Sequence, residues 1–539
     1  MLQLNRKGLL DTSAWEAADI ELPTFDLELV AHNTRIRPQW VHFGAGNIFR
    51  GLVANAQQQL LNTMQADTGI IAVETFDFEV IDKGYKPYDH LTLLVLMRAD
   101  GRFQKRVVAS IVEGLATEAS RPHDYHRLIE VFENPSLQMA SFTITEKGYA
   151  LTGPDGKYLT VVEQDVAKGP QQPFHVMSIA TSLAYRRYLK GQYPMTFVSM
   201  DNCSHNGDLL KASMTTIAKE WAARGLVEEG FIDYLEDEGN ITFPLTMIDK
   251  ITPRPSLEVQ AALQKLGIAD MELIVTSRHT YTAPFVNAEV SEYLVIEDKF
   301  TNGRPALEKA GIIFTDRDTV DQVETMKVTT CLNPLHTALA LSGCLLGYQL
   351  IADAMKDPAL RCLVETIGYK EGLPVVVDPG IIHPTTFIDE VLQERFANPY
   401  IPDTPQRIAT DTSQKMSIRF GKTLKSYVDT AGLDPGDLTA IPLTIAIWCR
   451  YLLGVDDQGV PFTLSPDPLM DTLQGYLQNT KLGDQTSEVR HLLADERLFG
   501  VQLYEIGLGD KIEGMFHEML AGPGAVRSTI EKYVRHTNT

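Results

Sequence analysis

The 539-residue chain has 48 basic and 70 acidic residues, a formal net charge of −22. This excess of acid argues against a nucleic-acid partner and against an anionic membrane surface, because proteins that bind either normally present a basic face. With 44% hydrophobic and 22% charged residues, the composition is that of a globular protein, and the length predicts more than one domain.

The five cysteines are scattered and form no CxxC pair, so the sequence predicts neither a disulfide framework nor a zinc knuckle. The N-terminus lacks a basic region followed by an apolar one, and no apolar run reaches the ~18 residues of a membrane span. We therefore expect a cytoplasmic protein without a membrane partner.

Residues 1–37 read as an N-terminal leader with short helical pieces. An apolar run at 40–43, a glycine turn and a helical pattern to about Met64 then predict a strand–turn–helix unit. Further strand-like runs alternate with amphipathic stretches, and this alternation predicts a largely parallel sheet. The strand-like runs are 69–76, 91–97, 105–112, 139–146 and 194–200, and the amphipathic stretches include 123–133 and 174–190.

After about Val320 helical patterns dominate, as at 332–357, 387–398, 438–454 and 511–522. The expected fold is therefore α/β, with a Rossmann-like N-terminal domain over 38–320 and a mainly α-helical C-terminal domain over 321–539. We expect the first to bind a dinucleotide and the second to carry substrate-binding and catalytic residues, with the ligand site in a cleft between them.

The glycine turn VHFGAGNIFRG places Gly44 and Gly46 after a strand and before a helix, where a pyrophosphate is favoured. Phe49 stands where a full GxGxxG motif has its third glycine. Taken alone, this turn fits a cofactor loop and a plain strand–helix connection equally.

An acidic residue at the end of the next strand would bind a ribose 2′-hydroxyl, and Glu74 stands there with Asp77 close behind. Because an acid at this place repels a 2′-phosphate, NAD is favoured over NADP. The alternative is that Glu74 only ends a strand.

The stretch KVTTCLNPLH brings together Lys327, Asn333 and His336. An alcohol that loses a hydride must also lose its hydroxyl proton, which a buried lysine can accept, and the developing alkoxide needs fixed hydrogen-bond donors. Singly, each residue has an ordinary alternative as a solvated lysine, a helix-capping asparagine or a core histidine.

The spacing of Lys327, Asn333 and His336 decides whether the three side chains can share one helix face. Asn333 and His336 share a helix face, but Lys327 would lie on the opposite face of an uninterrupted helix. Pro334 cannot donate a backbone hydrogen bond, so we expect a kink or a single π-type turn between Thr329 and Pro334, which would re-aim the lysine.

Several blocks resemble the polyol-specific long-chain dehydrogenases, the mannitol dehydrogenase family, and within it the fructuronate reductase branch. The blocks are VHFGAGNIFRG, SFTITEKGY, MDNCSHNGD, ITFPLTMIDKITP, YLVIEDKFTNGRPALEKAGIIF and RFANPYIPDT with RIATDTSQK. The family separates its lysine from its asparagine by one residue fewer than here, and the turn at Pro334 would absorb the insertion. Residues 1–37 lie outside the resemblance.

The resemblance implies a zinc-independent enzyme that binds no metal and uses NAD. It makes Lys327 the general base, Asn202 and Asn333 the donors to the alkoxide, and His336 a ligand of a substrate hydroxyl. Glu146 and Glu324 would assist proton passage, and Asp249, Arg407 and Lys415 would line the substrate pocket. The cofactor residues it implies are Phe43, Gly44, Gly46, Asn47, Arg50, Glu74 and Asp77.

Arg407 and Lys415 could also converge on an anion, which favours a sugar acid over a neutral polyol; contacts to hydroxyls or surface acids are the alternative. The expected reaction interconverts a keto-uronate and an aldonate of the D-fructuronate/D-mannonate type by hydride transfer. The alternatives are a mannitol 2-dehydrogenase acting on fructose and mannitol, a sugar-acid epimerase that retains NAD and, furthest, a catalytically silent NAD-binding or regulatory protein.

Overall fold

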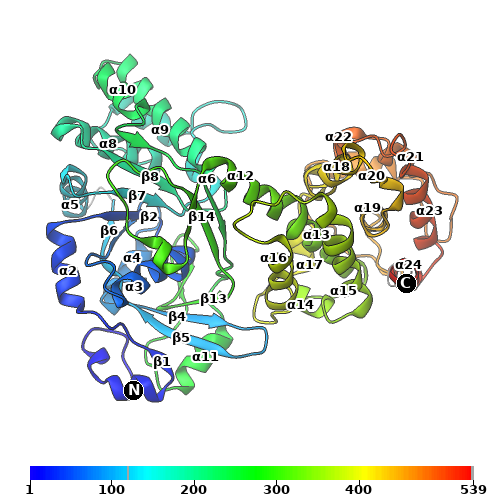
Figure 1. Cartoon of the computed structure of the whole chain (residues 1–539), viewed down its shortest axis with the longest axis horizontal. Coiled ribbons are helices and arrows are strands. Elements are labelled where there is room, and N and C mark those ends of the chain that lie inside the picture. Colours follow the sequence, from blue (N-terminus) through cyan, green and yellow to red (C-terminus); the bar gives the residue numbers. More distant parts are fainter. Residues whose placement is uncertain (118–120, 536–539) are drawn as a thin grey trace. The chain divides into compact units, whose positions relative to one another are not determined.

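The computed structural model describes residues 1–117 and 121–535, and the chain divides into two compact units. The first comprises 1–97 and 102–321, and the second comprises 98–101 and the chain from 322 on (Figure 1). The Rossmann-like and mainly helical architectures expected for the two parts are both confirmed.

Six parallel strands form the main sheet of the first unit, in the order β6-β3-β2-β7-β8-β9. Numbered along the chain, this is the order 3-2-1-4-5-6 of dinucleotide-binding sheets, which place their ligand where the strand order reverses. Here the order reverses between β2 and β7. The strands span Trp40–Phe43 (β2), Ile70–Glu74 (β3), Ile111–Ala116 (β6), Met139–Phe142 (β7), Met195–Ser199 (β8) and Ile241–Thr242 (β9).

Apolar side chains cover both faces of this sheet, because successive residues of a strand point to opposite sides. Val41 and Phe43 pack into one core with four helices, and Trp40 packs into a second core on the other face. The first core includes α5 (Pro122–Glu133), α8 (Val176–Gly191), α9 (Asn206–Ala223) and α10 (Glu229–Glu236). The second includes the π-helical η2 (Phe49–Val53), α3 (Ala54–Asn62) and α4 (Glu79–Gly84).

The expected strand at 105–112 is two strands, because the chain turns from one sheet to another at Ala109 and Ser110. The Ala109 amide donates to Gln58 Oε1 at 2.8 Å, and the Ser110 hydroxyl donates to the Ala54 carbonyl at 2.6 Å. β5 (Phe103–Val108) ends before this turn in the sheet β1-β5-β4-β13, and β6 begins after it. The partners of β5 are β1 (Ile20–Glu21) and β4 (Thr92–Met97), and β4 pairs in turn with β13 (Phe285–Glu289).

Two smaller sheets complete the strands of the first unit. One has the order β10-β14-β15, with bounds Thr246–Asp249, Tyr293–Glu297 and Ile313–Thr315. The other is the hairpin β11 (Ile274–Val275) and β12 (Tyr281–Thr282). The remaining helical segments are η1 (Gly8–Leu10), α1 (Thr12–Ala17), α2 (Leu27–Ile36), η3 (Lys86–Tyr88), α6 (Glu146–Tyr149), α7 (Thr160–Lys168), α11 (Leu257–Lys265) and η4 (Leu307–Ala310). α12 (Arg317–Met326) begins in the first unit and ends in the second.

The N-terminal segment 1–37 is packed rather than extended. The side chain of Trp15 is fully buried, and its indole nitrogen donates to the Gly8 carbonyl at 3.0 Å. β1 then joins the second sheet parallel to β5. The segment therefore contributes to the folded first unit.

Helices build the second unit, and α13 (Asn333–Leu345) and α19 (Ala440–Tyr451) are its most apolar. Every residue of α19 is buried. The other helices are α14 (Ile351–Ala354), α15 (Pro358–Glu365), α16 (Pro384–Glu390), α17 (Pro405–Ile408), α18 (Lys422–Asp429), α20 (Met470–Tyr476), α21 (Arg490–Leu493), α22 (Glu496–Phe499), α23 (Gly509–Met519) and α24 (Ala525–Arg535). Tighter or wider turns are η5 (Lys327–Cys331), η6 (Thr366–Gly372), η7 (Leu373–Val375), η8 (Val391–Arg395), η9 (Thr412–Gln414), η10 (Ser417–Gly421) and η11 (Pro435–Asp437).

Among the described residues, no helix combines the length and the hydropathy that crossing a membrane requires.

The buried carboxylate of Glu371 caps α19. It accepts hydrogen bonds from the amides of Thr439, Ala440 and Ile441 at 2.6, 2.7 and 2.8 Å. These amides have no partner within the helix, and the helix dipole favours a negative charge there. Burial raises the pKa of Glu371, and the three amides oppose this rise.

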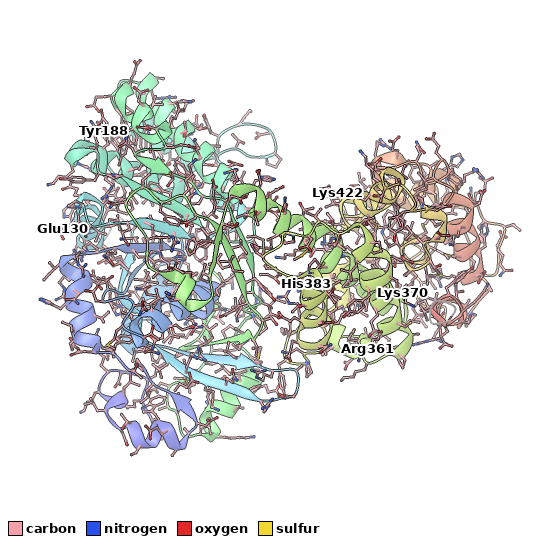
Figure 2. The ribbon with its side chains drawn as sticks, viewed as in Figure 1. Glu130, Tyr188, Arg361, Lys370, His383 and Lys422 are labelled. Atoms are coloured by element: carbon pink, nitrogen blue, oxygen red, sulfur yellow. The ribbon has the colours of Figure 1, made fainter. Side chains whose placement is uncertain are left out.

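Replacing Glu371 with glutamine should lower the free energy of unfolding by about 2 kcal/mol. The glutamine side chain carries no charge and has one acceptor oxygen fewer than the carboxylate at this buried helix terminus. Chemical denaturation monitored by circular dichroism measures this change. The matched control is Glu365→Gln. The Glu365 carboxylate pairs with the exposed Arg361, which is labelled in Figure 2, and a surface pair of this kind is worth about 0–1 kcal/mol. Equal losses in the two variants would contradict the capping role.

Candidate active site

The glycine turn follows β2 and requires glycine at its first position. Gly44 has φ +99°, and a Cβ there would lie 2.3 Å from the Thr143 carbonyl oxygen on the neighbouring strand's end. A Cβ at Gly46 would meet nothing within 4 Å. The turn is thus held close to β7 at Gly44 and faces open space at Gly46.

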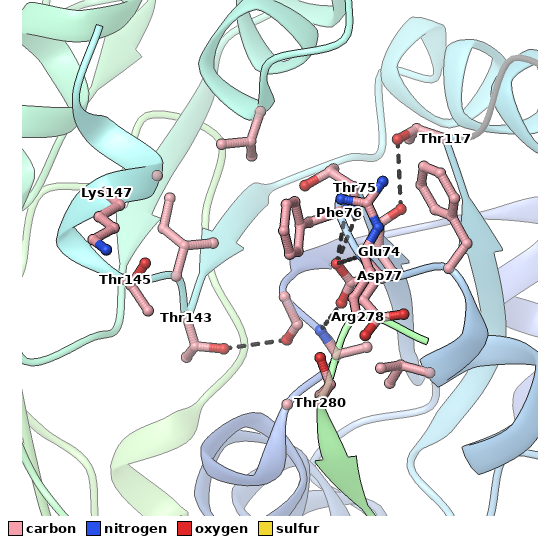
Figure 3. A pocket seen from close by; sticks show the side chains of 18 of the residues that line it. Glu74, Thr75, Phe76, Asp77, Thr117, Thr143, Thr145, Lys147, Arg278 and Thr280 are labelled. Atoms are coloured by element: carbon pink, nitrogen blue, oxygen red, sulfur yellow. Dashed lines mark hydrogen bonds between the residues drawn. The ribbon is translucent and has the colours of Figure 1, made fainter. Parts of the chain in front are cut away.

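A cavity of about 1020 Å³ opens beside this turn in the first unit (Figure 3). It lies at the carboxyl ends of the sheet strands, where the strand order reverses. Its lining comes from the glycine turn, the ends of β3 and β7, the start of α8 and the hairpin β11–β12. Lining residues include Gly44, Gly46, Asn47, Glu74, Asp77, Thr143, Lys147 and Arg278.

Glu74 ends β3, and its carboxylate joins two loops of the cavity. Oε2 accepts from the Ala45 amide of the glycine turn at 3.2 Å. Oε1 accepts from the amides of Thr75, Phe76 and Asp77 at 3.0, 2.9 and 3.3 Å. Burial raises the pKa of Glu74, and these backbone bonds lower it. Glu74, which is predicted to bind a ribose hydroxyl, therefore also fixes the conformation of the loop that would surround the ribose.

The structure places Phe43 in the core behind the glycine turn and Asp77 in a contact with the hairpin β11–β12. Phe43 is fully buried and stacks on Phe142 with ring centres 4.8 Å apart, so only its backbone faces the turn. Asp77 is buried, and its Oδ2 accepts a hydrogen bond from the Thr276 hydroxyl.

Arg50 is fully buried behind the glycine turn. Its guanidinium donates to the Asn47 side chain at 2.8 Å, to the Thr282 hydroxyl at 2.9 Å and to the Ala283 carbonyl at 2.7 Å. Burial lowers the pKa of Arg50. Arg50 is not among the lining residues, so its side chain anchors the turn, while Asn47 lines the cavity itself.

These observations fit a dinucleotide. A pyrophosphate requires close backbone approach, which the missing Cβ of Gly46 permits, and a ribose requires an acid at the end of the next strand. The residues that would hold it are Gly44, Gly46, Asn47 and Glu74.

Glu146 and Asn202 follow two neighbouring strands of the main sheet. β7 pairs with β8 in parallel, with Phe142 opposite Ser199, so the segments after them leave the same edge of the sheet. Glu146 is exposed at the start of α6, and Asn202 is exposed after β8.

A buried network joins these two segments. The Tyr149 hydroxyl, on α6, bonds to the Asp201 carboxylate and to the Ser199 hydroxyl, the latter at 2.6 Å. The Ser199 hydroxyl also donates to Asp201, at 3.0 Å. Burial raises the pKa of both Tyr149 and Asp201. Sequence reasoning missed Asp201 and Tyr149, although each lies within three positions of a predicted residue.

Asp249, the last residue of β10, is also in the first unit and is buried. β10 is tied to the end of β8, because the Thr246 hydroxyl donates to the Ser199 carbonyl at 2.6 Å. The first unit thus brings Glu146 and Asn202 to adjoining strand ends, and Asp249 lies at the other end of β10 from the bond to Ser199.

In the second unit a π-type turn is present as η5, which spans Lys327–Cys331 and so begins two residues before the expected span from Thr329 to Pro334. The Leu332 amide donates to the Lys327 carbonyl at 3.1 Å, a bond five residues long, and α13 begins at Asn333 with Pro334 in its first turn. Lys327 is buried, with 6% of its surface exposed, and Glu324 lies one turn earlier on α12.

Proline frees a carbonyl at this turn. In the π register Pro334 would donate to Thr329, and because proline has no amide hydrogen that carbonyl needs another partner. The Thr423 hydroxyl of α18 donates to the Thr329 carbonyl at 3.2 Å. A residue of another helix therefore supports the turn next to Lys327.

His336 lies one turn into α13 and contacts Asp403. Its Nε2 lies 2.8 Å from Asp403 Oδ2, and its ring packs on Phe396 with centres 4.8 Å apart. Burial lowers the pKa of His336, and Asp403 opposes this shift. Asp403 also pairs with Arg407, whose side chain is 64% exposed. The second unit thus joins His336 and Arg407 through an acid that sequence reasoning missed.

Lys415 and Arg419 form a second cationic group of this unit. Lys415 donates to the Thr410 carbonyl, and Arg419 donates to the hydroxyl of Thr337 on α13. Burial lowers the pKa of Lys415, with a further lowering from Arg419, and burial lowers the pKa of Arg419 to about 10. Sequence reasoning missed Arg419, although its i, i+4 spacing from Lys415 was a signal.

Within 1–117 and 121–535, no three His, Cys, Asp or Glu side chains gather as a metal ion would require.

Comparisons with known proteins cover both units. Residues 38–309 match the mannitol dehydrogenase Rossmann domain, and residues 319–519 match the mannitol dehydrogenase C-terminal domain. A D-mannonate oxidoreductase of Thermotoga maritima is 53% identical over 538 residues, 99% of each chain. A mannitol 2-dehydrogenase of Aspergillus fumigatus is 29% identical over 522 residues, 93% of each chain.

Two solved structures share the fold. A ternary complex of Pseudomonas fluorescens mannitol 2-dehydrogenase with NAD and D-mannitol is 26% identical, with a TM-score of 0.69 and 99% of each chain covered. A substrate-free D-sorbitol dehydrogenase is 24% identical, with a TM-score of 0.79 and coverage of 95% of this chain and 98% of that one. With both of its domain models matched and a relative 53% identical over nearly its whole length, the chain belongs to the mannitol dehydrogenase family.

Proposed function

We propose that this protein is a cytoplasmic, NAD-dependent oxidoreductase that interconverts D-mannonate and D-fructuronate. The observation that carries this proposal is the 53% identity to a D-mannonate oxidoreductase over 99% of both chains. The cavity beside the glycine turn supports the cofactor, and the five free cysteines are compatible with a reducing compartment.

In this proposal Gly44, Gly46 and Asn47 receive the pyrophosphate and Glu74 receives a ribose hydroxyl. Glu74 has both oxygens in backbone hydrogen bonds, but a carboxylate offers about four acceptor sites, so Oε2 retains capacity for one more donor. The cofactor, when bound, supplies the hydride acceptor for oxidation and the hydride donor for reduction.

Lys327 is the proposed general base. In its neutral form it accepts the proton of the substrate hydroxyl as the C–H hydride leaves, and it returns that proton to the alkoxide when the reaction runs in reverse. Asn202 and Asn333 donate hydrogen bonds to the alkoxide, and His336 binds a neighbouring hydroxyl. The carboxylates of Glu324 and Glu146 are proposed to pass the proton on to water.

The cations of the second unit support a sugar acid. Within the part of the chain that the structure describes, Lys415 and Arg419 form no ion pair, although the charges of Asp411 and Asp467 act on Lys415, whereas Arg407 is paired with Asp403. A uronate or aldonate carries a carboxylate that a neutral polyol lacks, and burying such cations without an anion is costly. We therefore propose Lys415 and Arg407 as substrate-binding residues, with Asp249 binding hydroxyls.

Replacing Lys327 with methionine should lower kcat with D-fructuronate by at least about a thousandfold, because the acid–base group is lost while the buried stem is kept. NADH oxidation followed by absorbance measures turnover, and NADH fluorescence should show unchanged cofactor binding.

The control for this variant is Lys422→Met, since Lys422 is exposed at the start of α18 (Figure 2). Turnover that survives in Lys327→Met would assign the base to another residue.

The substrate class can be read from NADH consumption with D-fructuronate, D-tagaturonate and D-fructose at matched concentrations. We expect consumption with a uronate and little with fructose. Consumption with fructose alone would favour the mannitol 2-dehydrogenase activity named for the 29% identical relatives. No consumption with any of the three would favour an epimerase that retains its NAD.

Lys415→Met should raise KM for D-fructuronate by roughly tenfold or more while changing kcat little, because a charge-assisted hydrogen bond to the carboxylate is lost from substrate and transition state alike. Steady-state kinetics beside Lys422→Met measure the split. A fall in kcat with unchanged KM would instead place Lys415 in the chemical step.

A further inference from the structure

One end of the cavity is bordered by an exposed aromatic ring and an arginine that no predicted role includes. Phe76, in the loop after β3, is 64% exposed. The Arg278 guanidinium lies over its ring, with Cζ 4.4 Å from the ring centre. Both residues line the cavity, and both are labelled in Figure 3.

The hairpin that carries Arg278 is fixed to the same loop. The Thr276 hydroxyl donates to Asp77 Oδ2 at 2.5 Å and accepts from the Thr280 amide at 3.0 Å. The Ser277 amide donates to Glu79 Oε2 at 3.3 Å. These bonds hold the hairpin turn on both sides of Arg278, so the stacking on Phe76 is built into the fold.

The charge of Arg278 is available to a ligand. Glu74 accepts four backbone amides, and Asp77 is engaged by Thr276, so the nearby acids serve the loop. Within the described chain, Arg278 has no carboxylate partner and only its contact with Phe76. A planar guanidinium that lies over a ring can also stack on a second planar group.

The position of this pair identifies the group it would meet. In a sheet of this order, the acid that ends the second strand marks the ribose of the adenosine half, and the pyrophosphate lies at the glycine turn. Phe76 follows that acid, and Arg278 lies over Phe76. Lys147 and Thr145 line the opposite part of the cavity, after β7.

We propose that Phe76 and Arg278 bind the adenine of the cofactor, with the base stacked on the guanidinium. This inference rests on the proposed dinucleotide function of the cavity. It assigns Asp77 to anchoring the hairpin through Thr276, and it leaves the ribose to Glu74.

The test compares fragment binding in the purified full-length protein by calorimetry. NADH and ADP-ribose contain the adenosine half, and nicotinamide mononucleotide does not. Arg278→Ala should weaken NADH and ADP-ribose by about tenfold and leave the mononucleotide unchanged, because only the stacking partner of adenine is lost. Arg278→Lys should weaken both by a similar factor, since lysine keeps the charge and loses the plane.

The matched control is Arg254→Ala. Arg254 stacks on Tyr281 of the same hairpin, with Cζ 4.3 Å from the ring centre, but does not line the cavity. If Arg278→Ala binds all three ligands with wild-type affinity, or binds all three equally more weakly, the proposed stacking of adenine on Arg278 is wrong. The proposed function fails separately, if the wild-type protein binds neither NADH nor ADP-ribose.

Discussion

The buried carboxylate of Glu74 is the interaction on which the cofactor cavity depends. It accepts one amide of the glycine turn and three amides of the loop after β3. A single side chain thereby sets the spacing between the part of the cavity suited to a pyrophosphate and the part suited to a ribose. Burial opposes its charge and raises its pKa, and four hydrogen bonds to the charged form limit that rise without cancelling it.

A chain of hydrogen bonds runs from Glu74 through Asp77 to the hairpin β11–β12. The Asp77 amide donates to Glu74, and the Asp77 carboxylate accepts from the Thr276 hydroxyl, so the hairpin β11–β12 is positioned relative to the loop. Arg278 then lies over Phe76 as a consequence of these bonds. Glu74 thus binds backbone amides and Asp77 binds a hydroxyl, and among the described residues neither acid forms an ion pair with Arg278 at the proposed adenine end.

In the second unit, a proline has the corresponding role. Pro334 frees the Thr329 carbonyl, the Thr423 hydroxyl satisfies it, and the π-helical turn that results begins at the buried Lys327. The turn departs from regular α-helical geometry close to the residue proposed as the base, and such departures cluster at functional sites. Asp403, between His336 and Arg407, adds a second constraint on the same helix.

The sequence by itself determined the features that depend on local order. The alternation of strands and helices predicted the parallel sheet, the glycines after β2 predicted the tight turn, and Pro334 predicted the π-type turn, because each follows from backbone sterics within a few residues. Tertiary structure decided what depends on distant partners. The break between β5 and β6 rests on Gln58 and Ala54, and the environment of Arg278 rests on a loop far earlier in the chain. Tyr149 meets Asp201, and Arg419 meets Thr337, for the same reason: such contacts form only when separate elements pack, and no local periodicity encodes them.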